Sequence, residues 1–254
     1  MSGLVTIGEI RLRYDHIQDI TGILEVYVLD VYNFRAVRDS SLVLDLGAGI
    51  GDFAVAAGKQ LGSRGRVLAI EPNPDDFQIL SDNIRANGLR NVVPLNCALG
   101  ETERPLTLSF KGKVIATSTW TLDRLLREAG LSADSLRDRP VSLKIDVEGA
   151  EVEVLRALNP LLRNVKSIAL ELHGTQRQVD ALLGPMGFVF ARLTRKEYLR
   201  NSLKFVLRHP RSAWSLWRVF RTSPGFHGLK GILGGIEISS SEQLAVGRYE
   251  RVRS

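Results

Sequence analysis

The sequence predicts an α/β protein built on a doubly wound, mostly parallel sheet of seven strands. Three observations lead to this prediction. Short apolar runs such as residues 42–44 alternate with helical patterns along most of the chain. Acids or glycines stand where several of these runs end, as at Asp45 and Glu71. The chain has neither an internal repeat nor a low-complexity tract, so strand and helix alternate through one fold.

The apolar runs place the individual elements. Strands are expected at residues 42–46, 66–71, 92–97, 141–145, 166–172, 188–193 and 243–250, the last of them antiparallel, with an added strand at 107–110. Helices are expected at 52–61, 75–87, 149–163 and 175–186. A further helix starts at Thr121, whose hydroxyl is typical of an N-cap.

Two segments extend this core. Residues 1–40 are expected to form an N-terminal unit, with a hairpin at 4–14 and helical spacing from Ile17 to Val31, that covers the cofactor site as a lid. A polar link at 35–40 leads into the main domain, 41–254. That domain carries a basic helical insertion at about 194–242, expected over the active site, in which Pro210 separates two short helices before a glycine-rich return.

A glycine turn joins the first core strand to its helix. Glycines at 47, 49 and 51 let the backbone approach a ligand, and the N–H groups of the helix start point toward it. Dinucleotide enzymes place a third glycine where this chain has Asp52. An acid on each side of a wide glycine turn suits a cationic cofactor without phosphate. We therefore expect S-adenosylmethionine rather than NAD.

The acid at the end of the second strand supports this expectation. Ligands of open α/β sheets bind beyond the carboxyl ends of the strands, where the Glu71 carboxylate can accept both ribose hydroxyls. The alternative is a cap or turn role before the next helix. An adenine would lie at Cys97, itself expected to be a small buried residue. The expected cofactor contacts are Asp45, Gly47, Ala48, Gly49, Gly51, Glu71, Pro72, Asn73, Cys97, Ala98 and Asp146.

Asp146, Glu148 and His173 are the expected catalytic residues. Asp146 and Glu148 follow the fourth strand, where they can position a substrate hydroxyl or take its proton. The alternative is that they cap the next helix or complement its dipole, which is the role we expect for Glu151. His173 follows the fifth strand, and an imidazole can accept a proton near pH 7.

A further acid, Glu171, lies within the fifth strand. A buried acid requires a partner, which Lys144 or His173 could supply. Carboxylates at 146, 148 and 171 could also hold a divalent cation together, although no residue is assigned as a metal ligand.

The net charge of +6 is concentrated in one segment. Residues 192–221 contain nine Lys or Arg and one acid, which leaves −2 for the rest of the chain. Basic amphipathic helices with Trp indicate either a peripheral membrane contact or a clamp for an anionic substrate. The alternative is a helical cap with solvated arginines, and charge alone leaves nucleic acid as a lesser possibility.

Cysteine content and hydropathy bear on the compartment. Cys97 is the single cysteine, so no internal disulfide forms and a reducing compartment is expected. Neither a leader nor a run of about 20 apolar residues is recognised. A cytoplasmic protein, at most peripherally membrane-associated, is expected.

From residue 42 to 190 the chain resembles the FkbM family of S-adenosylmethionine-dependent methyltransferases. The resemblance rests on Asp45-Leu-Gly-Ala-Gly-Ile-Gly51, Ala69-Ile-Glu-Pro-Asn-Pro74, Leu143-Lys-Ile-Asp-Val-Glu-Gly-Ala-Glu151 and Leu170-Glu-Leu-His173. It implies a Rossmann-like fold and methyl transfer to a hydroxyl of a sugar, glycolipid or natural-product-like acceptor. It also implies cofactor contacts at Asp45, Gly47, Gly49 and Glu71. Gly49 departs from the family, which usually has Asn there.

Two rival functions remain open in the sequence. A nucleic-acid methyltransferase that modifies bases usually has a (D/N/S)-P-P-(Y/F) motif at the fourth strand, where this chain has Asp146-Val-Glu-Gly149. A non-catalytic scaffold could use the fold and the basic helices to bind a membrane or an anionic polymer. The acids at 45, 71 and 146 argue against a degenerate enzyme.

Overall fold

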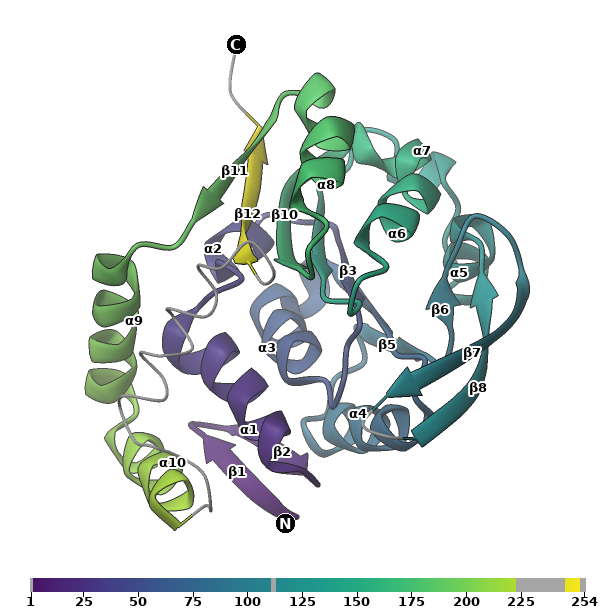
Figure 1. The fold of residues 1–254 in the computed structure, drawn as a ribbon. Coiled ribbons are helices and arrows are strands. Elements are labelled where there is room, and N and C mark those ends of the chain that lie inside the picture. The colour runs from purple at the N-terminus through teal and green to yellow at the C-terminus, as the bar shows by residue number, and fades with distance from the viewer. Residues whose placement is uncertain (1, 111–112, 223–244, 252–254) are drawn as a thin grey trace.

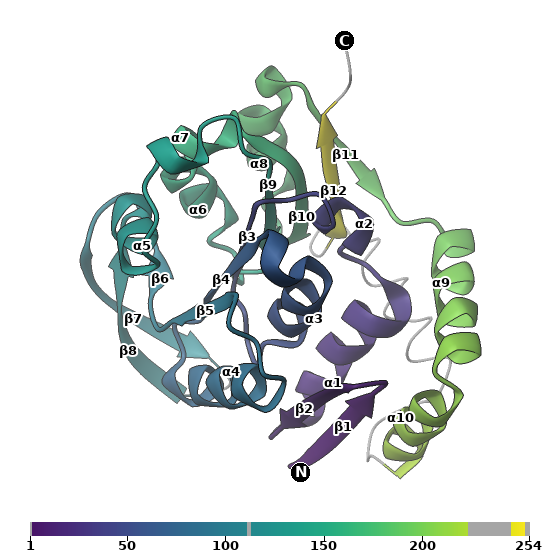
Figure 2. The same cartoon turned by 180° about the vertical axis from the view of Figure 1, so that it is seen from behind.

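A seven-stranded sheet forms the centre of the protein in a computed structural model that describes residues 2–110, 113–222 and 245–251. The strand order is β11-β12-β10-β9-β3-β4-β5. Figures 1 and 2 show this sheet from opposite sides, and β4 and β9 are labelled in Figure 2. β12 runs antiparallel to β10 and β11, while the pairs among β10, β9, β3, β4 and β5 are parallel. The bounds are β3 Leu42–Leu46, β4 Arg66–Ile70, β5 Val92–Leu95, β9 Val141–Ile145, β10 Val165–Leu172, β11 Phe188–Arg192 and β12 Ala245–Arg251. The predicted fold class is confirmed.

Helices cover both faces of this sheet and enclose two hydrophobic cores. Successive side chains of a strand point to opposite faces, so Val43 belongs to one core and Leu42, Leu44 and Leu46 to the other. The first core is covered by the N-terminal segment, α3 (Asp52–Leu61) and α4 (Pro74–Ala86), and the second by α5 (Leu122–Glu128), α6 (Glu151–Ala157), α7 (Asn159–Leu162) and α8 (Gln176–Leu183). Burial on both faces explains why the strands are continuous apolar runs.

A second, three-stranded sheet lies beside β5. It consists of β6 (Ala98–Leu99), β8 (Lys113–Trp120) and β7 (Arg104–Phe110), with β7 and β8 antiparallel. The sequence analysis predicted part of β7 but missed β8. β8 contains strand-favouring residues such as Val114, Ile115 and Thr119. It lacks the continuous apolar run that marks the strands of the main sheet, because this smaller sheet is largely exposed to solvent.

Two predicted segments differ from the structure. The helix expected at 149–163 starts at Glu151 and is split into α6 and α7, because Glu148 and Gly149 have positive φ and Pro160 stands in the first turn of α7. The polar link expected at 35–40 contains a short helix, α2 (Phe34–Val37).

The N-terminal unit packs against α3 and α4. The hairpin β1 (Gly3–Ile7) and β2 (Ile10–Tyr14) and the helical segment α1 (Ile17–Leu24) are confirmed, and α1 continues as a π-helical turn, η1 (Glu25–Leu29). Asn83 of α4 and Asn87, which directly follows that helix, bond the backbone of Arg13 and Arg11 in β2. The lid function itself stays a prediction.

The basic insertion begins with the two predicted helices, α9 (Arg195–Arg208) and α10 (Pro210–Thr222). They lie at one edge of the molecule, with α9 beside η1 and α10 beside β1 (Figure 2). The two helices therefore pack mainly on the N-terminal unit, and Glu197 of α9 also lies 3.3 Å from Arg248 of β12. A place of the insertion over the active site stays a prediction. The predicted glycine-rich return at 225–235 lies outside the described residues. No helix in the described ranges has the length and hydropathy to span a bilayer.

Candidate active site

Four neighbouring strands bring the predicted site residues to one edge of the sheet. Asp45 lies in β3, and Glu71, Asp146 and His173 directly follow β4, β9 and β10. Because these strands are parallel, their carboxyl ends meet at the same edge. The structure thus brings together residues that lie as much as 128 positions apart, counted as 173 minus 45.

The glycine loop after β3 is fixed by backbone contacts. The N–H groups of Gly47 and Ala48 both donate to the Ile70 carbonyl at 3.0 Å. Gly47 has φ of 75°, and a Cβ atom there would lie 1.8 Å from the Asp146 carbonyl oxygen. Gly49 also has positive φ, but no atom lies within 4 Å of its Cβ position. The loop therefore passes tightly against Asp146 and leaves open space at Gly49.

Glu71 is held at the loop by two backbone donors. One carboxylate oxygen accepts the N–H of Gly49 at 2.7 Å, and the other accepts the N–H of Asn73 at 2.8 Å. Each oxygen keeps a second lone pair for a further hydrogen bond. Burial raises the pKa of Glu71 to about 7, against the opposing effect of these two N–H donors. The cap role is filled by Asn73, whose side chain accepts from the Asp75 N–H.

The residues expected near an adenine surround the end of β5. Cys97 is buried, as expected, and burial raises the pKa of its thiol to about 12. Ala98 is half-buried at the start of β6. The Asn96 side chain donates to the Glu71 carbonyl at 2.8 Å, which ties this strand end to the ribose candidate.

A buried lysine on β9 links this strand to β3. Asp45 and Lys144 are register partners on β3 and β9, and Lys144 Nζ lies 3.4 Å from Asp45 and 3.6 Å from Asp146. Lys144 also donates to the Gly47 carbonyl. Burial raises the pKa of Asp45 to about 7, although Lys144 opposes this. Burial alone would lower the pKa of Lys144, but the three carboxylates of Asp45, Asp146 and Asp52 outweigh it and raise that pKa.

Further acids from the N-terminal half crowd the same lysine. Burial raises the pKa of Asp52 to about 6 and that of Glu25, in η1, to about 8, the latter with help from Glu171. The Asp52 carboxylate packs against α1, because a Cβ atom added at Gly22 of that helix would lie 2.7 Å from it. The site is therefore strongly acidic around the buried ammonium of Lys144.

His173 is oriented by a buried acid. Its Nδ1 lies 2.9 Å from a carboxylate oxygen of Glu151, which is fully buried and also accepts the Thr175 hydroxyl and the Gly149 N–H. Its Nε2 lies 3.4 Å from Glu148 and 3.7 Å from Glu171. The bond to Glu151 raises the pKa of His173 to about 9, against burial and with help from Glu171 and Glu148. His173 is thus a cation at neutral pH.

The positions of Glu148, Glu171 and Asp146 complete this end of the site. Glu148 is exposed, with φ of 51° in the turn before α6, while Asp146 and Glu171 are half-buried. Burial raises the pKa of Glu171 to about 7, with help from Asp146 and against His173. Ligand atoms of Asp146, Glu171 and His173 lie within 4.8 Å of one another. Of the two partners predicted for Glu171, Lys144 and His173, the structure places His173 within ion-pair distance.

Sequence reasoning missed the surroundings of four residues in the candidate site. It gave Glu151 a dipole role, whereas the carboxylate anchors His173. It used Asp52 to favour a cationic cofactor over NAD but did not place it beside Lys144, and it did not consider Glu25 at all. Lys144 was considered as a partner for Glu171 but pairs with Asp45 and Asp146. A lysine in the middle of an apolar strand was the signal, because a buried charge requires a counter-charge.

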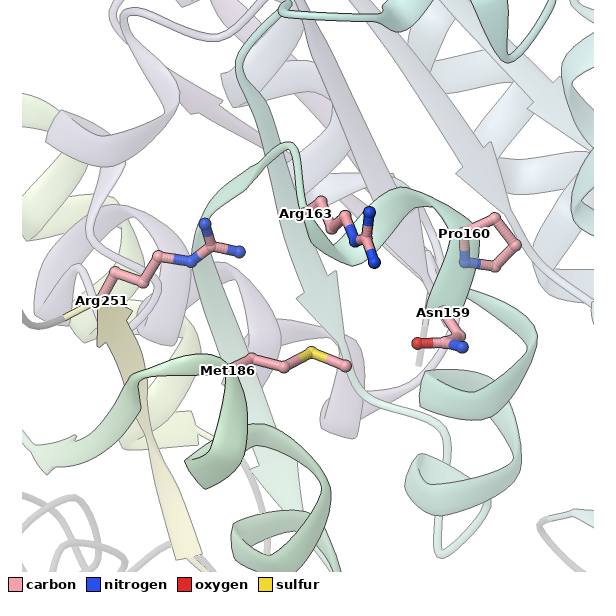
Figure 3. Close-up of a pocket in the computed structure, with 5 residues that line it drawn as sticks. All are labelled: Asn159, Pro160, Arg163, Met186 and Arg251. Atoms are coloured by element: carbon pink, nitrogen blue, oxygen red, sulfur yellow. The ribbon is translucent and has the colours of Figure 1, made fainter.

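The hollow shown in Figure 3 lies away from this edge. It has a volume of about 600 Å³ and is lined by Asn159, Pro160, Arg163, Met186 and Arg251. These residues belong to α7, the segments before β10 and β11, and the end of the antiparallel β12. The hollow is therefore at the amino ends of the parallel strands, and it includes none of the predicted site residues.

The geometry fits S-adenosylmethionine on three observations. Gly49 has open space at its Cβ position, Glu71 has spare lone pairs beside it, and neither carboxylate oxygen of Asp45 has a hydrogen-bond partner among the described residues. A glycine turn with an acid after the next strand defines an enzyme class that binds a nucleoside-containing cofactor, and the acidity favours a cation.

Comparisons with known proteins identify the family. Residues 45–199, more than half of the chain, match the methyltransferase FkbM domain. Methyltransferase sdnD of Sordaria araneosa is 27% identical over 211 residues, covering 66% of this chain and 81% of that protein. The hexuronic acid methyltransferase AglP of Haloferax volcanii is 30% identical over 145 residues, covering 54% of this chain and 57% of that protein. A crystal structure of methyltransferase FkbM from Methylobacillus flagellatus shares 20% identity over 68% of this chain and 38% of that one, with a TM-score of 0.39.

The chain belongs to the FkbM methyltransferase family and is a methyltransferase.

Proposed function

We propose that the protein transfers the methyl group of S-adenosylmethionine to a hydroxyl of a sugar, glycolipid or natural-product-like acceptor. The observation that carries the proposal is the division of one sheet edge into two adjoining parts. The glycine loop and Glu71 make a cradle suited to a nucleoside cofactor. Asp146, Glu148 and His173 lie beyond it, at the ends of β9 and β10. The similarity to AglP, a hexuronic acid methyltransferase, supports a sugar acceptor.

In this proposal Glu71 binds the ribose hydroxyls, while Asp45 and the other acids attract the cationic part of the donor. The remaining expected contacts, from Gly47 to Gly51, at Pro72 and Asn73 and at Cys97 and Ala98, line the same path along the strand ends. The sulfonium supplies an electrophilic methyl group when the donor is bound. The protein contributes orientation of the acceptor and removal of its proton.

We propose Asp146 as the group that takes the hydroxyl proton at neutral pH. His173 is already protonated there, because its pKa is about 9. Its imidazolium instead supports the negative charge that develops on the acceptor oxygen, held in place by Glu151 through Nδ1. Glu148, exposed at the rim, orients the acceptor. If His173 were the base, activity would rise as pH passes through about 9.

The test is transfer of a labelled methyl group to a panel of hexuronic acids, glycosides and phenols. Asp146→Asn should lower kcat by about 100-fold or more, whereas Glu153→Gln, an exposed acid on α6 outside the site, should act as wild type. At saturating donor, kcat is expected to fall as pH rises through about 9, because the His173 imidazolium then loses its proton. Methylation of nitrogen acceptors alone would contradict the proposed acceptor, and a rate that rises through pH 9 in the wild type but not in His173→Gln would contradict the proposed base.

The divalent cation considered from the sequence stays a prediction. Asp146, Glu171 and His173 offer ligand atoms close enough to share an ion, but His173 also lies close enough to Glu171, at 3.7 Å, to form an ion pair with it. No step proposed above requires a metal. Addition of Mg²⁺ or removal of metals by a chelator should leave the transfer rate unchanged, and a chelator-sensitive rate restored by Mg²⁺ would assign a metal to this group.

A further inference from the structure

We propose that α9 and α10 form a docking surface for an anionic lipid bilayer. The docking surface is defined here as the exposed side chains of residues 195–218. The proposal concerns a different surface from the active site and does not depend on which acceptor is methylated.

The first observation is a second apolar stripe on α9. α9 buries Tyr198 and Phe205 against the N-terminal unit. These two residues form the apolar stripe by which an amphipathic helix packs on a protein. Leu199, Leu203 and Val206 form another stripe, at spacings of four and three residues, and it is exposed, with Leu203 61% accessible. Such an exposed aliphatic stripe contributes favourable free energy only when a binding partner removes it from water.

The second observation is a pair of exposed tryptophans on α10. Leu216 anchors this helix to the core, while Trp214 is 60% accessible and stacks on Trp217 with ring centroids 4.8 Å apart. Tryptophan favours the boundary between water and lipid, where its ring is desolvated and its N–H still finds a partner.

The third observation is charge, and it decides the kind of partner. Exposed cations flank the apolar residues at Lys196, Arg200, Lys204 and Arg208 of α9 and at Arg211 and Arg218 of α10. The acid of these two helices, Glu197, is turned inward: it caps α9 at Thr194 and lies 3.3 Å from Arg248. Cations around an apolar stripe complement anionic headgroups above acyl chains. A nucleic acid would use the charge and the aromatic rings but not the aliphatic stripe.

The docking surface lies against the part of the chain that borders the active site. The Asn201 side chain donates to the Leu29 carbonyl of η1 at 2.8 Å, and η1 also carries Glu25. Both figures show α9 alongside this N-terminal segment (Figures 1 and 2). A bilayer bound at α9 and α10 would therefore face the N-terminal flank of the site.

The experiment uses the full chain and vesicles of phosphatidylcholine, alone or with a quarter phosphatidylglycerol. We expect sedimentation with the anionic vesicles only, weakened by salt, and a blue shift of tryptophan emission. Leu203→Asp and, separately, Arg200→Glu with Lys204→Glu should each weaken binding by about tenfold or more. Val114→Asp, at a still more exposed apolar position on β8, should bind as wild type. Trp214→Phe with Trp217→Phe should abolish the shift, since Trp120 is then the remaining tryptophan.

Three outcomes would overturn the proposal. The first is equal sedimentation with both vesicle types or with neither. The second is binding of single-stranded RNA that Leu203→Asp leaves unchanged, which would assign the surface to a polyanion. The third is a concentration-dependent dimer that the tryptophan variant disrupts. Each variant must keep the wild-type melting temperature and affinity for S-adenosylhomocysteine, which separates loss of docking from loss of fold or of the proposed cofactor site.

Discussion

At the scale of single residues, two glycines of one loop have different physical requirements. Gly47 combines positive φ with a close approach to the Asp146 carbonyl, so any side chain there would displace β9 or the loop. Gly49 requires only positive φ, which Asn tolerates better than most residues. The departure from the family at this position therefore leaves the backbone conformation available to either residue.

Gly47→Ala should lower the free energy of unfolding by about 2–5 kcal/mol, from the positive φ and the clash together. Gly49→Asn, the matched control, should change it by about 1 kcal/mol or less. Urea unfolding followed by circular dichroism measures both. Equal effects of the two substitutions would mean that the contact with Asp146 does not constrain the loop.

At the scale of elements, α4 connects the N-terminal hairpin to the cofactor loop. Asn83 and Asn87, one helical turn apart, bond both backbone groups of alternate residues in β2, much as a neighbouring strand would. Asn83 additionally donates to the Ile50 carbonyl at 2.8 Å. The sequence predicted the hairpin and the helix separately. It could not predict their attachment, because buried asparagines at helical spacing do not show which distant backbone they bond.

Asn83→Ala and Asn87→Ala should both expose β2 to faster amide exchange, because each leaves backbone groups of the hairpin unpaired. Only Asn83→Ala should also weaken binding of S-adenosylhomocysteine, by about fivefold, since a hydrogen bond to the loop contributes roughly 1 kcal/mol. Hydrogen exchange and calorimetry report the two effects. Equal affinities of the two variants would contradict a link between the hairpin and the loop.

At the scale of the whole molecule, the seven-stranded, mostly parallel sheet with its antiparallel last strand was predicted from the sequence, because strands buried on both faces are continuous apolar runs. The meeting of the acids at one edge was predicted because the carboxyl ends of parallel strands converge. What the sequence could not predict is the convergence of Glu25, Asp52 and Lys144. Their contacts depend on how the N-terminal unit packs, and no local pattern encodes that packing.

The crowded carboxylates predict how pH acts on ligand binding. Burial raises the pKa values of Asp45, Asp52, Glu71, Glu171 and Glu25 to between about 6 and 8, so their charge increases from pH 6 to pH 8. The affinity for S-adenosylmethionine should therefore rise relative to that for S-adenosylhomocysteine, whose sulfur is uncharged. We expect this affinity ratio to increase at least about threefold over the range, because one carboxylate ~6 Å from the sulfonium contributes about 0.7 kcal/mol even in a water-like dielectric. Calorimetry at both pH values measures the ratio. A ratio that falls or stays constant would show that these acids do not face the sulfonium.

The same groups predict the pH dependence of stability. A raised acid pKa means that the folded state binds more protons than the unfolded chain, so the stability that these groups contribute is largest at low pH and is lost as pH rises through about 6 to 8. The melting temperature of the ligand-free protein should accordingly be higher at pH 6 than at pH 8. Asp45→Asn should reduce this difference, whereas Asp134→Asn, an exposed acid far from the site, should preserve it.

The most direct test of the whole account is calorimetric titration with S-adenosylhomocysteine of the wild type, Glu71→Gln and Asp76→Asn. Asp76 is the matched control, a buried acid on α4 that bonds the Asn73 side chain. We predict binding by the wild type, a loss of about 10- to 100-fold in Glu71→Gln from weakened ribose hydrogen bonds, and a change within about threefold in Asp76→Asn. A wild type that does not bind, or a Glu71→Gln variant that binds equally well, would contradict the cofactor site described here.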